Sequence, residues 1–260
     1  MTEIAFYHVD AFTDVAFGGN PAGICPLDAW LPSETMQAIA FENNLSETAF
    51  FVANATGYHL RWFTPKIEVS LCGHATLASA YVIARHINPG VEKVLFDSAS
   101  GPLLVTRRGE VFTLDFPVSR PEPFDDKGAV FEALGVQPQA VLKAGKMMAV
   151  LADETAVRDV EPHLERVSRL PADGLIVTAP GDDCDFVSRF FAPHAGIPED
   201  PVTGSAHCVL TPYWAERLGK TVMEARQISA RGGKLTVEDR GERVLLSGRV
   251  TPYLEGRIRV

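Results

Sequence analysis

Short apolar runs separated by turn-forming residues dominate the chain, a pattern typical of a protein built largely from strands. Apolar residues at helical spacing predict helices over 33–43, 74–86 and 205–218, and a shorter one over 130–134 that ends at Gly135. Pro212 lies inside the third of these, so we expect a kink there or a restart with Thr211 as cap. The predicted strands are 4–9, 49–52, 60–63, 94–96, 103–105, 111–116, 234–237, 244–248 and 256–260.

A weak internal echo divides the chain into halves. The sequences Cys72-Gly-His-Ala-Thr and Thr203-Gly-Ser-Ala-His each open an apolar helix, and their glycines, 73 and 204, are 131 residues apart. A polar, proline-bearing stretch at 119–127 lies between them and is the best linker candidate in the chain. By itself a four-residue match of this kind is no more than a hint that the chain of 260 residues contains a duplication.

Composition and charge exclude several classes of function. The net charge is −9, and the nearest basic cluster is Arg107-Arg108 before a glycine, so a nucleic-acid partner is not expected. No apolar run approaches the ~18 residues of a membrane span, and the first residues lack the pattern of a secretion signal, which predicts a cytoplasmic protein without a membrane partner. The four cysteines form no CxxC pair, so neither a metal site nor a disulfide framework is expected.

Both echoed motifs place a glycine and a small polar residue where a loop becomes a helix. Unpaired backbone N–H groups and the positive end of the helix dipole gather at such a start, which therefore attracts an anion. The amides of Gly73, His74, Gly204 and Ser205 are thus candidates for holding a substrate carboxylate.

Three side chains are candidates for acid–base chemistry. Glu47 stands directly before an apolar strand, and a carboxyl group in that position, once desolvated, can act as a general acid or base that contributes ~10²–10⁴-fold in rate. Asp200 precedes a proline and stands five residues before Ser205, so a turn can aim it at the second helix start. His74, at the first helix start, is the one histidine with a catalytic context. Each of these residues taken alone also fits an ordinary turn or cap.

The motifs become specific in combination. Together they resemble the phenazine biosynthesis PhzF-like family, from the first strand to the last third of the chain. The segments that carry the resemblance are His8-Val-Asp-Ala-Phe-Thr, Phe17-Gly-Gly-Asn-Pro-Ala-Gly, Asn44-Leu-Ser-Glu-Thr, Phe63-Thr-Pro, Cys72-Gly-His-Ala-Thr, Phe190-Phe-Ala-Pro and Glu199-Asp-Pro-Val-Thr-Gly-Ser-Ala-His.

The resemblance implies a fold similar to diaminopimelate epimerase, with two alike α+β half-domains, each a curved and mostly antiparallel sheet around a central helix. It implies an N-terminal half-domain of residues 1–118, completed by the last strand at about 250–260, a C-terminal half-domain of 119–249, and an active site in the cleft between them. A homodimer is also implied.

The activity implied by the resemblance is a cofactor-free isomerisation, in which one glutamate moves a proton within a small carboxylate-bearing metabolite. The matching positions assign catalysis to Glu47, His74 and Asp200, and substrate binding to Gly73, Gly204, Ser205, Asn20 and Cys72.

Two other functions stay open at this stage. The related epimerase uses two cysteines, one before each glycine, but Thr203 occupies the second position here, which disfavours an amino- or imino-acid racemase or epimerase. A protein that binds a small molecule without turnover is the other alternative, and the presence of Glu47 argues against it.

Overall fold

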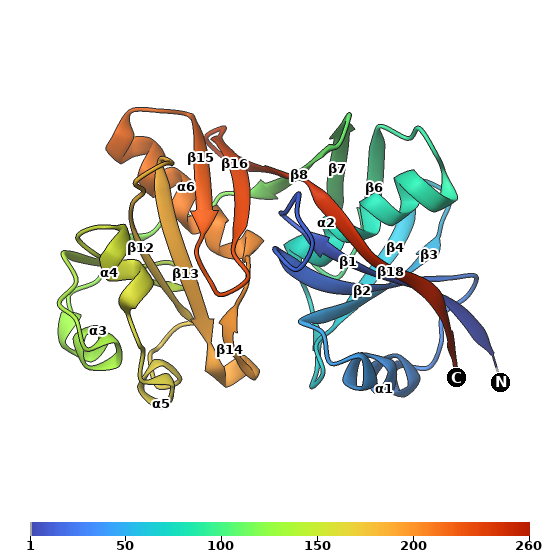
Figure 1. Ribbon diagram of the computed structural model, residues 1–260, viewed down its shortest axis with the longest axis horizontal. Coiled ribbons are helices and arrows are strands. Elements are labelled where there is room, and N and C mark those ends of the chain that lie inside the picture. The colour runs from blue at the N-terminus through green and yellow to red at the C-terminus, as the bar shows by residue number, and fades with distance from the viewer. Residues whose placement is uncertain (1) are drawn as a thin grey trace. The chain divides into compact units, whose positions relative to one another are not determined.

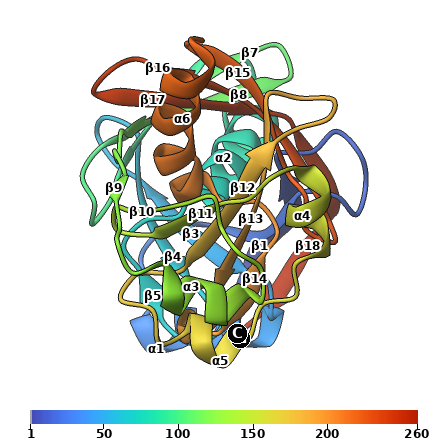
Figure 2. The same cartoon turned by 90° about the vertical axis from the view of Figure 1, so that its left-hand side faces the viewer.

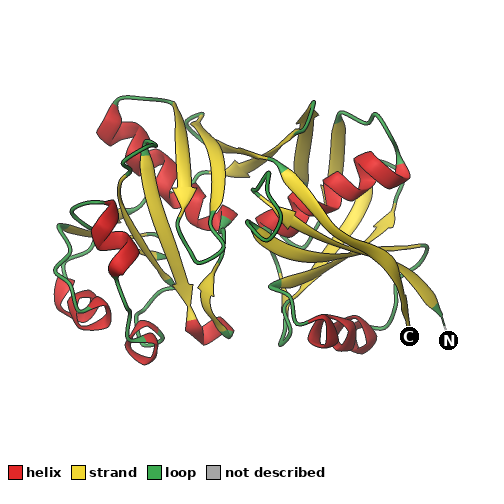
Figure 3. Ribbon diagram, in the orientation of Figure 1, coloured by secondary structure: helices red, strands yellow, loops and turns green. Residues whose placement is uncertain are grey.

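The chain folds into two compact units (Figures 1 and 3). In the computed structural model, which describes residues 2–260, one unit runs to Asp115 and includes Ser247–Val260, and the other is Phe116–Leu246. Each unit has a curved sheet of mixed, mostly antiparallel pairing with a buried helix packed on it. The expected α+β class with two similar halves is confirmed.

The sheet of the first unit runs in the order β18, β1, β2, β3, β4, β6, β7, β8. All neighbours are antiparallel except the pairs β2–β3 and β4–β6, which are parallel, and the short β5 pairs with β4. The strands are β1 Glu3–Ala11, β2 Asn20–Leu27, β3 Glu47–Ala53, β4 Tyr58–Phe63, β5 Glu68–Val69, β6 Lys93–Asp97, β7 Leu103–Arg108, β8 Val111–Pro117 and β18 Val250–Arg259.

Two helices pack on this sheet. Helix α2, Gly73–Val82, is buried along its whole length, contacts β1, β2, β3, β7 and β18, and continues into the π-helical turn η1, Ile83–Ile87. Helix α1, Ser33–Asn43, lies on the outside and buries Met36, Ile39 and Ala40 against Phe6 and Phe50. The first unit is therefore a sheet wrapped around α2, with α1 as an outer cover (Figure 1).

The second unit repeats this plan. Its sheet runs β9, β10, β11, β12, β13, β15, β16, with β11–β12 and β13–β15 parallel, and β14 pairs with β13. The elements are β9 Glu122–Pro123, α3 Lys127–Leu134, β10 Ala140–Lys143, β11 Met147–Val150, α4 Glu154–Asp159, α5 Leu164–Val167, β12 Leu175–Pro180, β13 Phe186–Ala192, η2 Pro193–Ala195, β14 Ile197–Asp200, α6 Gly204–Leu218, β15 Val222–Gln227, β16 Gly233–Asp239 and β17 Arg243–Gly248.

The two faces of this second sheet are covered differently. On one face, alternate residues of the strands, among them Met147 of β11 and Val187 of β13, form an apolar core with α3, α4 and α5. On the other face Trp214 of α6 stacks on Phe186 and donates a hydrogen bond to Thr178 of β12. Figure 2, in which this unit faces the viewer, shows the three short helices over the sheet.

The parallel pairs make the duplication visible. In each half a long helix follows a short strand and leads into a strand that pairs in parallel with an earlier one: β4, β5, α2, β6 in the first unit and β13, β14, α6, β15 in the second. Each helix start also has a side chain that contacts the backbone carbonyl four residues before it. Thr76 donates to the Cys72 carbonyl, and the His207 ring lies 2.8 Å from the Thr203 carbonyl.

The helix 205–218 continues through Pro212 as one element, so a restart at Thr211 is wrong. A proline lacks the N–H that would bond the carbonyl four residues earlier, which here belongs to Cys208. The backbone N–H of Ser119 donates to that carbonyl instead, at 3.1 Å. The connection between β8 and β9 thus supplies the hydrogen bond that the proline removes.

The pattern did not predict the strands β2, β5, β9, β10, β11, β12, β13, β14 and β15. Residues Met147–Val150 and Leu175–Val177 are buried throughout, so these paired strands read as short continuous apolar runs that do not alternate. Among residues 2–260, no helix combines the length and apolar character needed to cross a membrane.

The approach to β2 depends on Gly19, a position where a side chain would be both strained and too close to the backbone. Gly19 has φ +68°, and a Cβ there would lie 2.3 Å from the Ala11 carbonyl oxygen. Gly109, in the β7–β8 turn, has a similar φ of +61° but open space around it. Both glycines would be strained by a side chain because of their positive φ, but only at Gly19 would the side chain also clash with the backbone.

We predict that Gly19→Ala lowers the thermal midpoint much more than Gly109→Ala. The turn substitution should cost about 1–2 kcal/mol, the left-handed penalty alone, whereas Gly19→Ala adds a backbone clash of roughly 1–3 kcal/mol. Differential scanning calorimetry of both variants measures the difference. Equal midpoints would contradict the steric argument.

Candidate functional site

Glu47 is positioned by the end of α1. Asn44 adopts a left-handed conformation, φ 48°, and its N–H closes the helix on the Ala40 carbonyl. The chain then turns and β3 begins at Glu47, which pairs in parallel with Ala22 of β2. The Glu47 side chain is buried at this first position of the strand, with the residue 8% exposed.

His74 and Cys72 lie beside Glu47 at the start of α2. Cys72 is extended, φ −144°, and the helix begins at Gly73. His74 Nε2 lies 3.2 Å from Glu47 Oε2, and His74 Nδ1 lies 3.5 Å from Cys72 Sγ. The structure therefore brings together three predicted site residues in one buried row of thiol, imidazole and carboxyl group.

His74 is a neutral imidazole. Complete burial lowers its pKa to about 3, and the nearby carbonyl of Pro21 only partly opposes that effect. At neutral pH the 3.2 Å approach of the two side chains is consequently a contact between an uncharged ring and a carboxyl group, not an ion pair. Such a ring can orient a carboxylate and still leave it available as a base.

Two further predicted residues belong to this unit. Asn20 is the first residue of β2, fully buried and immediately before Pro21, whose carbonyl faces the His74 ring. Gly73 is the first residue of α2, so its backbone N–H is among those that have no partner inside the helix.

Glu47, Cys72 and His74 each have one potential ligand atom within 4.8 Å of the other two, a spacing that a bound metal ion could span. The imidazole argues against one ion bound by all three. Its Nδ1 faces the thiol and its Nε2 faces the carboxyl group, and a single ion binds only one nitrogen of a ring. The geometry fits a row of contacts, with a hydrogen bond between thiol and imidazole, better than a coordination sphere.

The second unit holds a matching helix start with different chemistry. Asp200 ends β14, and its Oδ2 accepts a hydrogen bond from the Thr203 hydroxyl at 2.5 Å. Thr203 directly precedes α6, whose first residues are Gly204 and the half-buried Ser205. The predicted residues Asp200, Gly204 and Ser205 therefore lie at one end of α6.

Gln227 holds this region together and was missed by the sequence reasoning. Its Oε1 accepts from the Thr203 N–H at 2.8 Å, and its Nε2 donates to the Asp200 carbonyl at 2.7 Å and to the Thr203 hydroxyl at 3.1 Å. Gln227 is fully buried at the end of β15. No motif contains it, so only the pairing of strands could reveal it.

Lys146 is a second residue that the sequence did not reveal. It lies in the β10–β11 turn, with its ammonium group 5.7 Å from the ring centre of Phe190, the residue that pairs with Asp200. Burial lowers the Lys146 pKa, and the neighbouring Asp173, Cys208 and Asp200 oppose this. A partly desolvated cation near Asp200 is suited to binding an anionic group.

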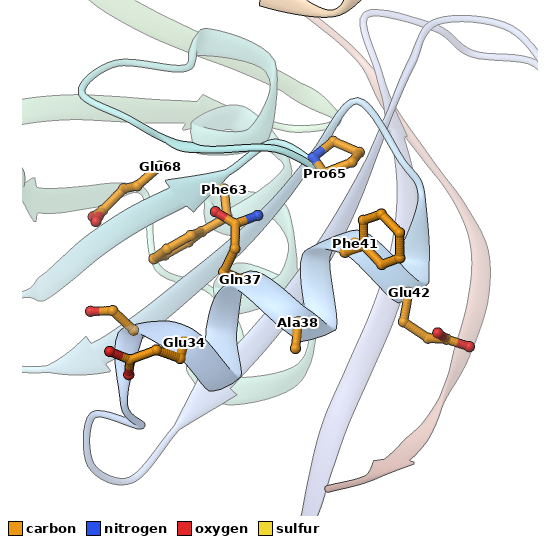
Figure 4. Close-up of a pocket in the computed structure, with 9 residues that line it drawn as sticks. Glu34, Gln37, Ala38, Phe41, Glu42, Phe63, Pro65 and Glu68 are labelled. Atoms are coloured by element: carbon orange, nitrogen blue, oxygen red, sulfur yellow. The ribbon is translucent and has the colours of Figure 1, made fainter.

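A separate groove of about 800 Å³ lies over α1 and includes none of the predicted site residues. Figure 4 shows its apolar walls, Phe41, Phe63 and Pro65, together with the acidic side chains of Glu34, Glu42 and Glu68 around them.

We predict that Gln227→Leu destabilises the protein strongly. The substitution leaves the Thr203 N–H and the Asp200 carbonyl buried without this partner, and each such group costs about 1–3 kcal/mol. Gln37→Met is the control, because the half-buried Gln37 makes a single side-chain bond, to the Thr64 carbonyl. A urea midpoint for Gln227→Leu no lower than that of Gln37→Met would contradict this role.

The two buried histidines predict a loss of stability in acid. The pKa values of His74 and His207 are about 3 and about 4 in the folded protein, below the ordinary value of ~6.5 that the unfolded chain regains. Below that value the unfolded state binds more protons, so the free energy of unfolding falls as the pH drops, by up to roughly 1.4 kcal/mol per pH unit for each ring.

His207→Gln should remove one of these two contributions. We therefore expect its urea midpoint to fall less steeply than that of the wild type between pH 6 and pH 4.5. Parallel curves for the two proteins would show that His207 is not held neutral by burial.

The chain is similar to proteins of a known family. The family model described as phenazine biosynthesis-like protein matches residues 9–256. An isomerase of Pseudomonas aeruginosa, itself uncharacterized, is 49% identical over 256 residues, which cover 98% of this chain and 99% of that protein.

Solved structures agree. A phenazine biosynthesis protein of the PhzF family from Enterococcus faecalis is 44% identical and superposes with a TM-score of 0.97 over 100% of both chains. A hydroxyproline epimerase from Agrobacterium vitis, 10% identical, has a TM-score of 0.62 over 98% of this chain and 92% of that one, a likeness of fold alone. This chain belongs to the phenazine biosynthesis-like, PhzF, protein family.

Proposed function

We propose that this protein is a cofactor-independent isomerase that moves a proton within a small carboxylate-bearing metabolite, with Glu47 as the acid–base group. The proposal rests on one observation, the buried Glu47 carboxyl group 3.2 Å from the neutral His74 ring at the start of α2. The family supports isomerase chemistry, since its curated relatives include proteins named as isomerases.

The proposed step is a proton transfer in which one residue, Glu47, both removes and returns the proton. The Glu47 carboxylate removes a proton from a carbon of the substrate, and the electron pair left behind is delocalised into the adjacent unsaturated system. The resulting Glu47 carboxylic acid then returns that proton to a different carbon, so the double bond moves and the formula is unchanged. No electron is gained or lost, and an acid–base group is sufficient for the chemistry.

Within its own unit, each helix start is proposed to favour an anionic group of a substrate, and in the second unit Lys146 is proposed to do the same. Backbone N–H groups at Gly73 and Gly204 favour an anion by about 0.3–1 kcal/mol per helix end, and up to ~2 kcal/mol where partly buried. A lysine ammonium with a lowered pKa adds a charge of the required sign. Asp200 and Ser205 are proposed to assist by hydrogen bonding.

A racemase that uses two bases is a weaker proposal. The position that corresponds to Cys72 is Thr203, whose hydroxyl already donates to Asp200 at 2.5 Å. A hydroxyl is also too weak an acid or base near neutral pH to replace a thiol. One shuttle residue accords with isomerisation, in which the proton leaves and returns without a second group on the opposite side of the carbon.

The role of Glu47 is tested with a panel of unsaturated small carboxylates in D₂O, by following isomer formation by NMR and deuterium incorporation by mass spectrometry. Isomer formation is measured as well because a proton that Glu47 returns directly escapes exchange with solvent. We expect Glu47→Gln to slow isomer formation by about 10²–10⁴-fold. Glu42→Gln, at an exposed position of α1, should leave the rate unchanged.

Equal rates for the wild type and Glu47→Gln would rule out the proposed role of Glu47. Loss of configuration at a stereocentre, with the double bond unmoved, would replace the isomerase by a racemase. Binding of a carboxylate without turnover in the wild type would replace both by a binding protein.

A further inference from the structure

Cys72 completes the buried row that contains His74 and Glu47. Its Sγ lies 3.5 Å from His74 Nδ1, on the nitrogen that does not face Glu47, and the residue is 7% exposed. We infer that the Cys72 thiol is a positioning residue that fixes the tautomer of His74, so that the ring presents an Nε2–H donor to Glu47. Both its catalytic meaning and the carboxylate form of Glu47 rest on the proposed function, whereas the tautomer is measured independently of activity.

The assignment follows from counting donors and acceptors around the ring. A neutral imidazole has one N–H donor and one acceptor nitrogen. The groups that face His74 are the Glu47 carboxyl group, the Pro21 carbonyl and the Cys72 thiol. A carbonyl only accepts, and so does Glu47 in the carboxylate form that the proposed function requires, so the thiol is the one of these three groups able to donate to the acceptor nitrogen. Because the thiol faces Nδ1, the proton of the ring belongs on Nε2.

Burial makes this choice matter. A doubly protonated ring could donate to both sides, but complete burial keeps the pKa of His74 at about 3, so the charged form is absent at neutral pH. The other neutral tautomer would turn the lone pair of Nε2 toward the Glu47 carboxylate, which is repulsive in a buried site. A partner on one ring nitrogen thus decides what the other nitrogen offers.

The second unit provides an internal comparison. His207 is also buried and neutral, with a pKa of about 4, but its Nδ1 lies 2.8 Å from the Thr203 carbonyl. A carbonyl only accepts, so His207 carries its proton on Nδ1. The protein therefore contains two buried neutral histidines whose surroundings call for opposite tautomers.

The tautomers can be read directly from protein labelled with ¹⁵N-histidine, by long-range ¹H–¹⁵N NMR at pH 7. We expect the Nε2–H form for His74 and the Nδ1–H form for His207 in the wild type. Cys72→Ala should shift His74 to a mixture or to the Nδ1–H form, whereas Cys72→Ser, which keeps a donor, should retain Nε2–H. Cys208→Ala is the matched control, because that buried thiol contacts the Gly204 carbonyl and not a histidine ring.

Activity supplies the second readout. Cys72→Ala should lower kcat by about 10–100-fold, the size expected for losing a hydrogen bond that orients a charged group, with little change in KM. Cys72→Ser should recover most of that loss. A simple packing role for the thiol would not produce rescue by the polar variant together with a tautomer change.

The inference is overturned if wild-type His74 is found as Nδ1–H, or if Cys72→Ala leaves its tautomer unchanged. These outcomes are separate from those that test Glu47. Full turnover in Glu47→Gln would remove the proposed function and leave the tautomer assignment standing, whereas an inactive Glu47→Gln with an unchanged His74 tautomer in Cys72→Ala would remove this inference alone.

Discussion

A helix buried along its whole length constrains everything around it, because each of its polar groups needs a partner inside the protein. Helix α2 is such an element, since all ten of its residues are buried. Thr76 and Ser79 donate back to carbonyls of the preceding turn. His74 has no such option, and it lies between Cys72 and Glu47. The candidate site thus lies at the buried polar start of this helix.

The same constraint recurs in the second unit with other residues. The residue before the first glycine of α6 is Thr203, and Asp200 and Gln227 bind its hydroxyl and its N–H. In the strand that corresponds to β3, the first position is Leu175 instead of Glu47. The framework of strands and helix starts is therefore duplicated, whereas the acid–base residues differ between the halves.

Much of the fold was accessible from the sequence because its signals are local. The predicted helix 33–43 coincides with α1, and 205–218 falls within α6, since caps and apolar spacing are read within a few turns. The interior strands β11 and β12 were missed, because strands buried on both faces do not alternate. The effect of Pro212 was also misjudged, since the compensating donor, Ser119, lies far away in the sequence.

The sequence by itself determined the family motifs, the α+β class with two similar halves, and the residue types available for chemistry. It could not determine which of those residues touch. Glu47 and His74 are 27 positions apart and are separated by β4 and β5, so their 3.2 Å contact exists only once the sheet has closed around α2. The neutral state of His74 likewise arises from burial. Gln227 and Lys146 belong to no motif, and strand pairing alone brings them to Asp200, because partners across a sheet are set by tertiary structure and not by spacing along the chain.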